Sequence, residues 1–297
     1  MPIQYAGGTN VNNTFTQSGS ATRREIVDGI VTELGTAGWS TISGGGTGDV
    51  LLESATTPAG LKMRVRVLDP GSGNCAQVKV RNASNSISQS SAMFLVPGNG
   101  KTWRVIANKY QCFVFVPGTS ASREYAAWGV PYTSDSNITT CFWAQGNAQS
   151  DTDTTVRPTF RTVLHTTFNF NCPISVCCVN DGWWENPANT NFSYLFGGSQ
   201  YLLIPSTAIG NHISSAGYRW HDGNALIVEP LLSFGSVSSS DEGKVRGQLW
   251  DAFLTTEAYA VDTTLSGVDS KNWWCLTNNN TGAARGSLRG SLFLMTP

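Results

Sequence analysis

Residues 61–81 of this chain read LKMRVRVLDPGSGNCAQVKVR, and this stretch decides the fold class. Apolar side chains occupy every second position on both sides of a turn: Leu61, Met63, Val65, Val67, Ala76, Val78 and Val80. A period of two is typical of a β-strand with one buried face, and the Asp-Pro-Gly-Ser-Gly segment between the runs predicts a turn. The stretch therefore predicts an antiparallel hairpin with one buried face and one wet, basic face.

Short apolar runs separated by Gly, Asn, Ser and Thr continue through most of the chain. We expect strands at residues 110–116, 160–168, 174–179, 194–196, 201–204, 225–232, 248–254, 273–277 and 291–295. The first of these runs is apolar on both faces, which favours a central strand. Strands of this length and spacing indicate a mainly β fold, built of antiparallel β-sandwich or barrel-like domains.

One short amphipathic helix precedes these strands. Thr22 and Glu25 have the spacing of a capping box, and Gly35 is placed to end the helix. The apolar residues between them fall on one stripe: Ile26, Val27, Ile30, Val31 and Leu34. A helix of about 13 residues that contains Gly29 is too weak to persist alone in water, so its stripe must be buried against a sheet.

Composition divides the chain into four parts. Residues 147–158 are polar and acidic, without large apolar side chains, and are predicted as a linker. The other parts are an extended N-terminal arm at 1–20, a helix plus antiparallel β domain at 21–146, and a second antiparallel β domain at 159–297.

The arm carries four apolar side chains that a solvated tail would not need: Ile3, Tyr5, Val11 and Phe15. They are the candidate partner-docking residues, because an extended segment can add a strand to the sheet edge of a neighbour. A disordered tail is the alternative interpretation.

The charge composition limits the possible partners. Charged residues make up 13% of the chain, and 19 basic against 20 acidic residues give a net charge of -1. This composition lacks the electrostatic footprint of a nucleic-acid or anionic-membrane binder. A surface poor in charge and rich in aromatic residues is expected where other subunits cover it. The basic face of the hairpin is either a solvated surface or a contact for an anionic partner such as an acidic neighbouring subunit.

The sequence also predicts where the chain is made. No stretch approaches the roughly 20 consecutive apolar residues of a membrane span, and residues 1–20 lack the basic and apolar segments of a secretion signal. We therefore expect synthesis in a cytoplasm, without export.

Signatures of catalysis and metal binding are weak. The three histidines, His165, His212 and His221, accompany no nucleophile elbow. Cys177 and Cys178 are adjacent on an expected strand and would point to opposite faces, so they cannot easily share one ion. Residues 98–102, GNGKT, lack the first glycine of a phosphate-binding loop and predict a hairpin turn. We expect no enzyme, no metal site and no cofactor.

One segment suggests carbohydrate binding. Trp183 and Trp184 stand between Asp181 and Glu185 in an expected loop. Aromatic platforms and paired acids suit sugar binding and glycosidic cleavage, so the two indoles are candidate glycan contacts. Packing in a core is the alternative for tandem tryptophans.

Several segments resemble minor structural proteins of tailed bacteriophages. They are residues 22–67, with the capped helix, Ala-Gly-Trp at 37–39 and Glu-Ser-Ala at 53–55; residues 107–115, ANKYQCFVF; residues 246–253, RGQLWDAF; Trp-Trp at 273–274; and Gly-Ser-Leu at 286–288. The likeness covers most of the chain and contains no catalytic motif, so it implies no family site residues.

The resemblance implies a structural subunit of a virion, in the tail or baseplate, that acts by protein-protein assembly. The expected partners are other virion proteins and copies of the same chain in a symmetric ring, with a host glycan as a further candidate and no nucleic acid. The expected location is the virion, after synthesis in the bacterial host cytoplasm. The alternatives are a glycan-binding virion module that touches the host surface, a neck or capsid-associated structural protein, and a glycan-degrading enzyme.

Overall fold

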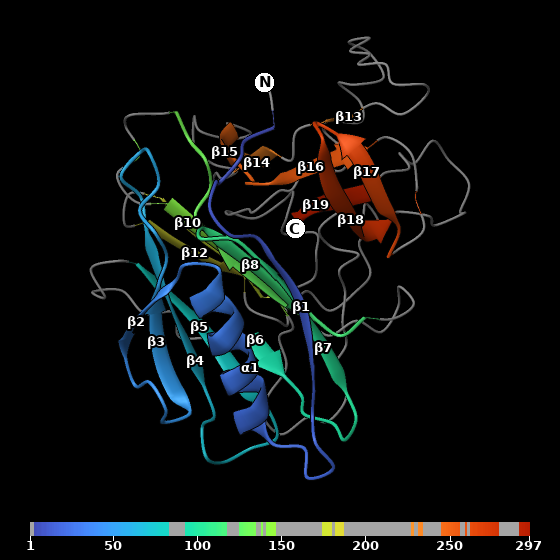
Figure 1. Cartoon of the computed structure of the whole chain (residues 1–297). Coiled ribbons are helices and arrows are strands. Elements are labelled where there is room, and N and C mark those ends of the chain that lie inside the picture. Colours follow the sequence, from blue (N-terminus) through green and yellow to red (C-terminus); the bar gives the residue numbers. More distant parts are fainter. Residues whose placement is uncertain are drawn as a thin grey trace.

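A computed structural model describes residues 3–82, 93–117, 125–134, 138, 141–146, 174–179, 182–186, 227–228, 231–233, 245–255, 259, 262–278 and 291–297 (Figure 1). Over these residues it confirms the mainly β fold with one short helix near the N-terminus. Every ladder between its strands is antiparallel. The predicted strands at 160–168, 194–196 and 201–204 lie outside the described residues.

The predicted hairpin of residues 61–81 lies inside a five-stranded sheet of order β2-β3-β4-β5-β6. Val65 pairs with Val80 and Val67 with Val78, and all four side chains are buried. The strands are β2 (Ser40–Ser43), β3 (Asp49–Glu53), β4 (Met63–Leu68), β5 (Ala76–Asn82) and β6 (Met93–Leu95).

A second sheet has seven strands in the order β1-β7-β8-β9-β10-β11-β12. They are β1 (Val11–Thr16), β7 (Thr102–Ala107), β8 (Gln111–Phe115), β9 (Tyr125–Gly129), β10 (Cys141–Gly146), β11 (Ile174–Val179) and β12 (Gly182–Asn186). β8 is buried along its whole length, which confirms the central strand predicted there. β10 pairs with β11, so this one sheet takes strands from both sides of the predicted linker at 147–158. The linker itself lies outside the described residues.

The C-terminal part contributes a five-stranded sheet of order β13-β16-β19-β18-β17 and a two-stranded sheet, β14-β15. The strands are β13 (Ile227–Val228), β14 (Leu231–Ser233), β15 (Val245–Gln248), β16 (Ala252–Thr255), β17 (Thr264–Val268), β18 (Lys271–Asn278) and β19 (Ser291–Thr296). β18 and β19 match the strands predicted at 273–277 and 291–295. The strand predicted at 248–254 is interrupted, because Asp251 adopts a left-handed backbone with φ of 47°.

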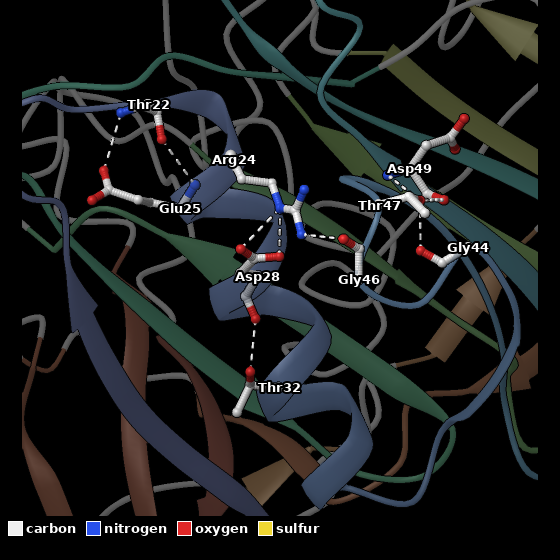
Figure 2. Close-up of polar contacts among 9 residues, drawn as sticks. All are labelled: Thr22, Arg24, Glu25, Asp28, Thr32, Gly44, Gly46, Thr47 and Asp49. Carbon is white, nitrogen blue, oxygen red and sulfur yellow. Dashed lines mark hydrogen bonds and ion pairs between the residues drawn. The ribbon is translucent and has the colours of Figure 1, made fainter.

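Helix α1 (Arg23–Thr36) begins at the predicted capping box. The Glu25 amide donates to Thr22 Oγ1 at 3.3 Å, and the Thr22 amide donates to the Glu25 carboxylate at 3.0 Å (Figure 2). Most of the predicted stripe is buried, at Ile26, Val27, Ile30 and Leu34. At Gly29 the ring of Phe15 packs so closely that an added Cβ would lie 2.7 Å from it. The glycine that weakens the helix therefore lets β1 pack against it.

The glycine-rich segment after β2 is a hairpin loop held by the helix. Arg24 Nε donates to both carboxylate oxygens of Asp28, at 2.8 and 2.9 Å, and Nη2 donates to the Gly46 carbonyl at 2.8 Å (Figure 2). Gly44 has φ of +79°, and a Cβ there would lie 1.9 Å from the Asp49 carbonyl oxygen. The turn therefore requires glycine at position 44 for reasons of backbone geometry.

One hydrophobic core joins the helix to the sheets. Its buried members include Ile30 of α1, Val65 of β4, Val114 of β8 and Trp274 of β18. In Figure 1, α1 lies between the first five-stranded sheet and the β1–β7 side of the seven-stranded sheet, in agreement with its contacts. Burying one such large apolar side chain contributes about 1.5–3 kcal/mol, so elements that share this core depend on one another for stability.

Candidate functional site: a buried polar junction around Asp251

Asp251 is a charged residue in the interior of the protein. It lies between the apolar residues Leu249 and Trp250 and the first residue of β16, Ala252. Only 2% of its surface is exposed. Its φ of 47° is a left-handed conformation that few residues other than Gly, Asn and Asp adopt readily. This backbone turns its carboxylate toward donors from distant parts of the chain.

Three side-chain and backbone donors converge on this carboxylate. The Ala6 amide donates to Oδ1 at 3.0 Å, while Asn10 Nδ2 and Asn108 Nδ2 donate to Oδ2 at 3.1 and 2.6 Å. The Asp251 backbone takes part as well, because its amide donates to the Gln4 carbonyl at 2.8 Å and its carbonyl accepts from the Met295 amide at 2.8 Å. The residues Gln4, Ala6, Asn10, Asn108, Gln111, Trp250, Asp251 and Met295 are called the Asp251 junction below.

Two opposing effects set the protonation of the carboxyl. Burial raises the pKa of Asp251 above its ordinary value of 3.8, while the hydrogen bonds from Ala6, Asn10 and Asn108 and the charge of Lys109 act in the opposite direction. Burial is the largest of these influences and the pKa is raised overall. The carboxyl group therefore accepts three hydrogen bonds, but these bonds and the charge of Lys109 do not fully offset the effect of burial on its pKa.

Asn108 connects the carboxylate to the turn between β7 and β8. Its Oδ1 accepts hydrogen bonds from the amides of Tyr110 and Gln111, at 2.9 and 3.0 Å, which fixes the orientation of its side-chain amide. Its backbone carbonyl accepts from Trp39 Nε1 at 2.9 Å. The backbone carbonyl of the next residue, Lys109, accepts a hydrogen bond from the Ala55 amide at 3.0 Å. The turn therefore receives contacts from the loops that follow α1 and β3.

The side-chain amide of Gln111 extends the junction by pairing with the backbone of Trp250, in the way that a strand backbone would. Its Nε2 donates to the Trp250 carbonyl, and its Oε1 accepts from the Trp250 amide at 3.2 Å. Gly129 lies opposite Gln111 in the β8–β9 ladder, and a Cβ on Gly129 would lie 2.6 Å from that of Gln111. The indole of Trp250 also packs on Tyr110, with ring centroids 4.6 Å apart.

The candidate docking residues of the N-terminal segment all contact their own chain. Val11 is buried and pairs with Ala107, and Phe15 is half-buried on the same strand, β1. Ile3 packs on the core of the C-terminal sheet. Tyr5 is 37% exposed and donates its hydroxyl to Asp269 at 2.6 Å; burial and this hydrogen bond raise the pKa of Tyr5.

The segment predicted as an extended arm therefore supplies a strand to the sheet of its own chain, and residues 4–10 run to the Asp251 junction. Docking of Ile3, Tyr5, Val11 and Phe15 onto a neighbouring subunit stays a prediction.

The two candidate glycan contacts lie in a strand, and the predicted loop is wrong at these positions. Trp183 and Trp184 belong to β12, where they pair with Cys178 and Cys177 of β11. Asp181, the acid predicted to flank them on the N-terminal side, lies outside the described residues. Contact of Trp183 and Trp184 with a glycan stays a prediction.

The basic face of the predicted hairpin carries carboxylates from β3. Glu53 accepts from Lys62 Nζ at 2.9 Å and from Arg64 Nε at 2.8 Å. Asp49 accepts from Arg66 Nε at 2.7 Å, and this hydrogen bond lowers the pKa of Asp49. Burial raises the pKa of Glu53, but the hydrogen bonds from its two cations outweigh this effect and the pKa is lowered. The face is therefore a network of ion pairs with an excess of cations.

Comparisons with known proteins add no relative. No family model matches the chain, and a search of the curated proteins finds no significant match. Among the described helices, none is long and apolar enough to cross a membrane. Within the part of the chain that the structure describes, no three His, Cys, Asp or Glu side chains gather as metal ligands.

Sequence reasoning did not single out Asp251 or Asn108. One signal was present: Asp251 is a charged residue inside the apolar run LWDAF, where an unpaired carboxylate would be costly. What the sequence could not supply is the partner, because the donors lie 143 to 245 residues away along the chain.

Proposed function

We propose that this chain is a structural subunit of a tailed-bacteriophage virion, in the tail or baseplate, and that it acts by protein-protein assembly. Its expected partners are other virion proteins and further copies of itself in a ring. The low charge of the chain supports this proposal, because surfaces that become covered by other subunits are depleted in charged residues.

The observation that carries the proposal is the convergence of the resembling segments. Residues 37–39 reach the junction through Trp39, which donates to Asn108, and residues 53–55 reach the neighbouring residue Lys109 through Ala55. Residues 107–115 supply Asn108 and Gln111, and residues 246–253 supply Trp250 and Asp251. Segments that resemble phage structural proteins separately are thus parts of one packed unit.

The convergent residues hold the fold together. The Asp251 carboxylate is buried and accepts hydrogen bonds from Ala6, Asn10 and Asn108, and the nearby indoles of Trp39 and Trp250 are buried as well. An interior network of this kind suits a subunit whose task is to keep its shape under contact with neighbours. Rings place many copies side by side, so moderate interfaces add up through symmetry.

The test is the assembly behaviour of the purified chain. Light scattering gives the mass in solution, and negative-stain images of the same sample give the shape, alone and after addition of tail or baseplate proteins of a phage that encodes the chain. We expect a ring, or a monomer that joins those proteins in fixed stoichiometry. A monomer that ignores them and releases sugars from host envelope glycans would overturn the proposal.

A further inference from the structure

Residues 3–6, called the N-terminal strap below, are bound by the C-terminal part of the chain. The contacts join Ile3 to the cluster of Phe253 and Trp273, the Gln4 carbonyl to the Asp251 amide, the Tyr5 hydroxyl to Asp269, and the Ala6 amide to the Asp251 carboxylate. Gln4 also forms a parallel bridge with Trp250, and Figure 1 shows the strap passing the beginning of β16. The partners of the strap are called the strap site: Trp250, Asp251, Phe253, Asp269 and Trp273.

A short exposed link joins the strap to β1. Residues 7–9, Gly-Gly-Thr, are all exposed, and Gly7 and Gly8 have φ of 68° and 89°. The nearest atoms to a Cβ built at these two positions belong to the Lys109 side chain, at ordinary contact distances of 3.9 and 3.7 Å. Because glycine adopts positive and negative φ about equally readily, this link can also become extended without strain.

We propose that the N-terminal strap of one copy of this chain binds the strap site of a second copy, which gives its own strap to the first. The proposal rests on the proposed function, in which copies of the chain lie beside each other. The second copy offers an identical strap site, so every contact of residues 3–6 is kept and only residues 7–9 change conformation. Exchange of an identical element between subunits is a low-cost route to association for this reason.

The length of the link restricts how the two copies meet. Asn10, the residue after the link, donates to the same Asp251 carboxylate as Ala6, at 3.1 Å, so both ends of the link are anchored at one place in the closed chain. An extended chain covers at most about 3.3–3.6 Å per residue, so the step from Ala6 to Asn10 reaches roughly 14 Å. The two strap sites must lie about that close together, which fits a two-fold pair that meets at this face.

A second copy is a better occupant of the strap site than an unrelated protein. An unrelated segment would need an apolar side chain, a carbonyl, a phenol hydroxyl and an amide in the order of residues 3–6, which every copy of this chain already has. The strap of the same chain competes with that of the neighbour, at an effective concentration set by the link. We therefore expect closed single chains in dilute solution and exchanged pairs where copies are crowded together.

The experiment changes the link and measures the mass of the full chain by light scattering, over a range of concentrations. A double variant, Gly7→Ala with Gly8→Ala, places two alanines in left-handed conformations, and each should reduce the population of the closed link roughly five- to thirtyfold. Gly60→Ala is the matched control, because Gly60 is exposed, has φ of 82° and would meet no atom within 4 Å of an added Cβ. We expect the double variant to associate at least about tenfold more tightly than the wild type, and Gly60→Ala to leave association unchanged.

Two further substitutions in the double variant identify the strap as the segment that joins the copies. Ala6→Pro removes the amide hydrogen that is donated to the Asp251 carboxylate, so we expect the double variant that carries it to have the mass of a single chain. Tyr5→Phe removes only the hydroxyl that donates to Asp269, and it should weaken association by a smaller factor. Circular dichroism of each protein checks that the fold is kept.

Two results would overturn the exchange: a double variant that associates no more tightly than Gly60→Ala, and association that neither Ala6→Pro nor Tyr5→Phe weakens. Assembly with other proteins separates the exchange from the proposed function. If the exchange fails in one of these ways while the wild type joins tail or baseplate proteins in fixed stoichiometry, each strap stays on its own chain and the structural role stands. If strap-dependent pairs form but the chain never joins those proteins, the exchange is right and the proposed function fails.

Discussion

Replacing Asp251 with Asn tests whether the buried junction depends on a carboxylate. The substitution keeps the size of the side chain and its tolerance of the left-handed backbone. Oδ1 can still accept from the Ala6 amide, but the new amide group faces the donors of Asn10 and Asn108. Asn108 cannot rotate to offer its oxygen, because that atom already accepts from the amides of Tyr110 and Gln111.

The expected cost follows from these contacts. A hydrogen bond to a charged group contributes about 1.5–3 kcal/mol, and two are replaced by donor-to-donor contacts. Relief of the buried charge offsets part of the loss, so we expect the free energy of unfolding to fall by about 3 kcal/mol. At roughly 2–4 °C per kcal/mol for a chain of this size, the melting temperature should fall by about 6–12 °C.

Urea unfolding followed by tryptophan fluorescence measures this difference, with Asp262→Asn as the control. Asp262 is exposed and also has a positive φ, of 69°, so the control makes the same chemical change in a similar backbone conformation. The control should change stability by less than about 0.5 kcal/mol. An Asp251→Asn protein as stable as the wild type would refute the reasoning, because it would show that the carboxylate contributes nothing beyond its burial cost.

The pH dependence of the same pair is a further part of this test. Because the pKa of Asp251 is raised, the folded chain binds a proton more readily than the unfolded chain between pH 3.8 and the folded value. Stability contributed by this carboxyl therefore falls as the pH rises through that window. A protonated carboxyl keeps an acceptor lone pair on each oxygen, which the amide nitrogen of Asn lacks. The advantage of the wild type over Asp251→Asn should thus be larger near about pH 4 than near about pH 8.

Three other tests follow from the glycines and the ion pairs. Gly29→Ala should destabilise the chain by about 1–2 kcal/mol in thermal unfolding, because the ring of Phe15 occupies the place of the new methyl group. Gly35→Ala in the same helix is the control: its methyl group meets nothing within 4 Å, so it should stabilise the chain by up to about 1 kcal/mol. Equal effects of the two substitutions would contradict the close packing at Gly29. Gly44→Ala should lower the melting temperature far more than Gly46→Ala, since both have positive φ but only the first meets a backbone oxygen, at 1.9 Å. The lowered pKa of Glu53 gives the wild type stability that is present above pH 4.5 and is lost as the pH falls through that pKa, and Glu53→Gln should remove this stability. In urea titrations the free energies of unfolding of the two proteins should therefore become equal in acid. A difference that stays constant with pH would contradict the contribution of the ion pairs.

The elements that the sequence predicted well are those whose signal is local. The capping box at Thr22 fixed the start of the helix, and the alternation from Leu61 to Val80 identified β4 and β5, because both patterns depend on neighbours a few residues apart. The apolar run at 110–116 indicated a central strand for the same reason: burial on both faces is visible in composition alone.

What the sequence could not predict depends on pairings between distant residues. The pairing of Val11 with Ala107 draws the N-terminal segment into its own sheet, and no local pattern distinguishes this from pairing with a neighbour. Trp183 and Trp184 are flanked by turn-forming residues and acids, yet the ladder with β11 makes them a strand. The hydrogen bonds of Asp251 come from Ala6, Asn10 and Asn108, which are all distant from it in the sequence. No local pattern predicts these partners, because only the fold brings them together.

The hydrogen bond between Ala6 and Asp251 spans 245 residues, and this sets an order of events during synthesis. A ribosome adding about 5–20 residues each second takes on the order of 10 to 50 s to travel that distance. Throughout this time Ala6 has no Asp251 carboxylate to which it can donate, and the neighbouring side chains of Ile3 and Tyr5 lack the contacts that they make with the C-terminal sheet. The contacts of residues 4–6 with Asp251 can therefore form only after residue 251 has been made, so this part of the fold closes late relative to the pairing of β1 with β7.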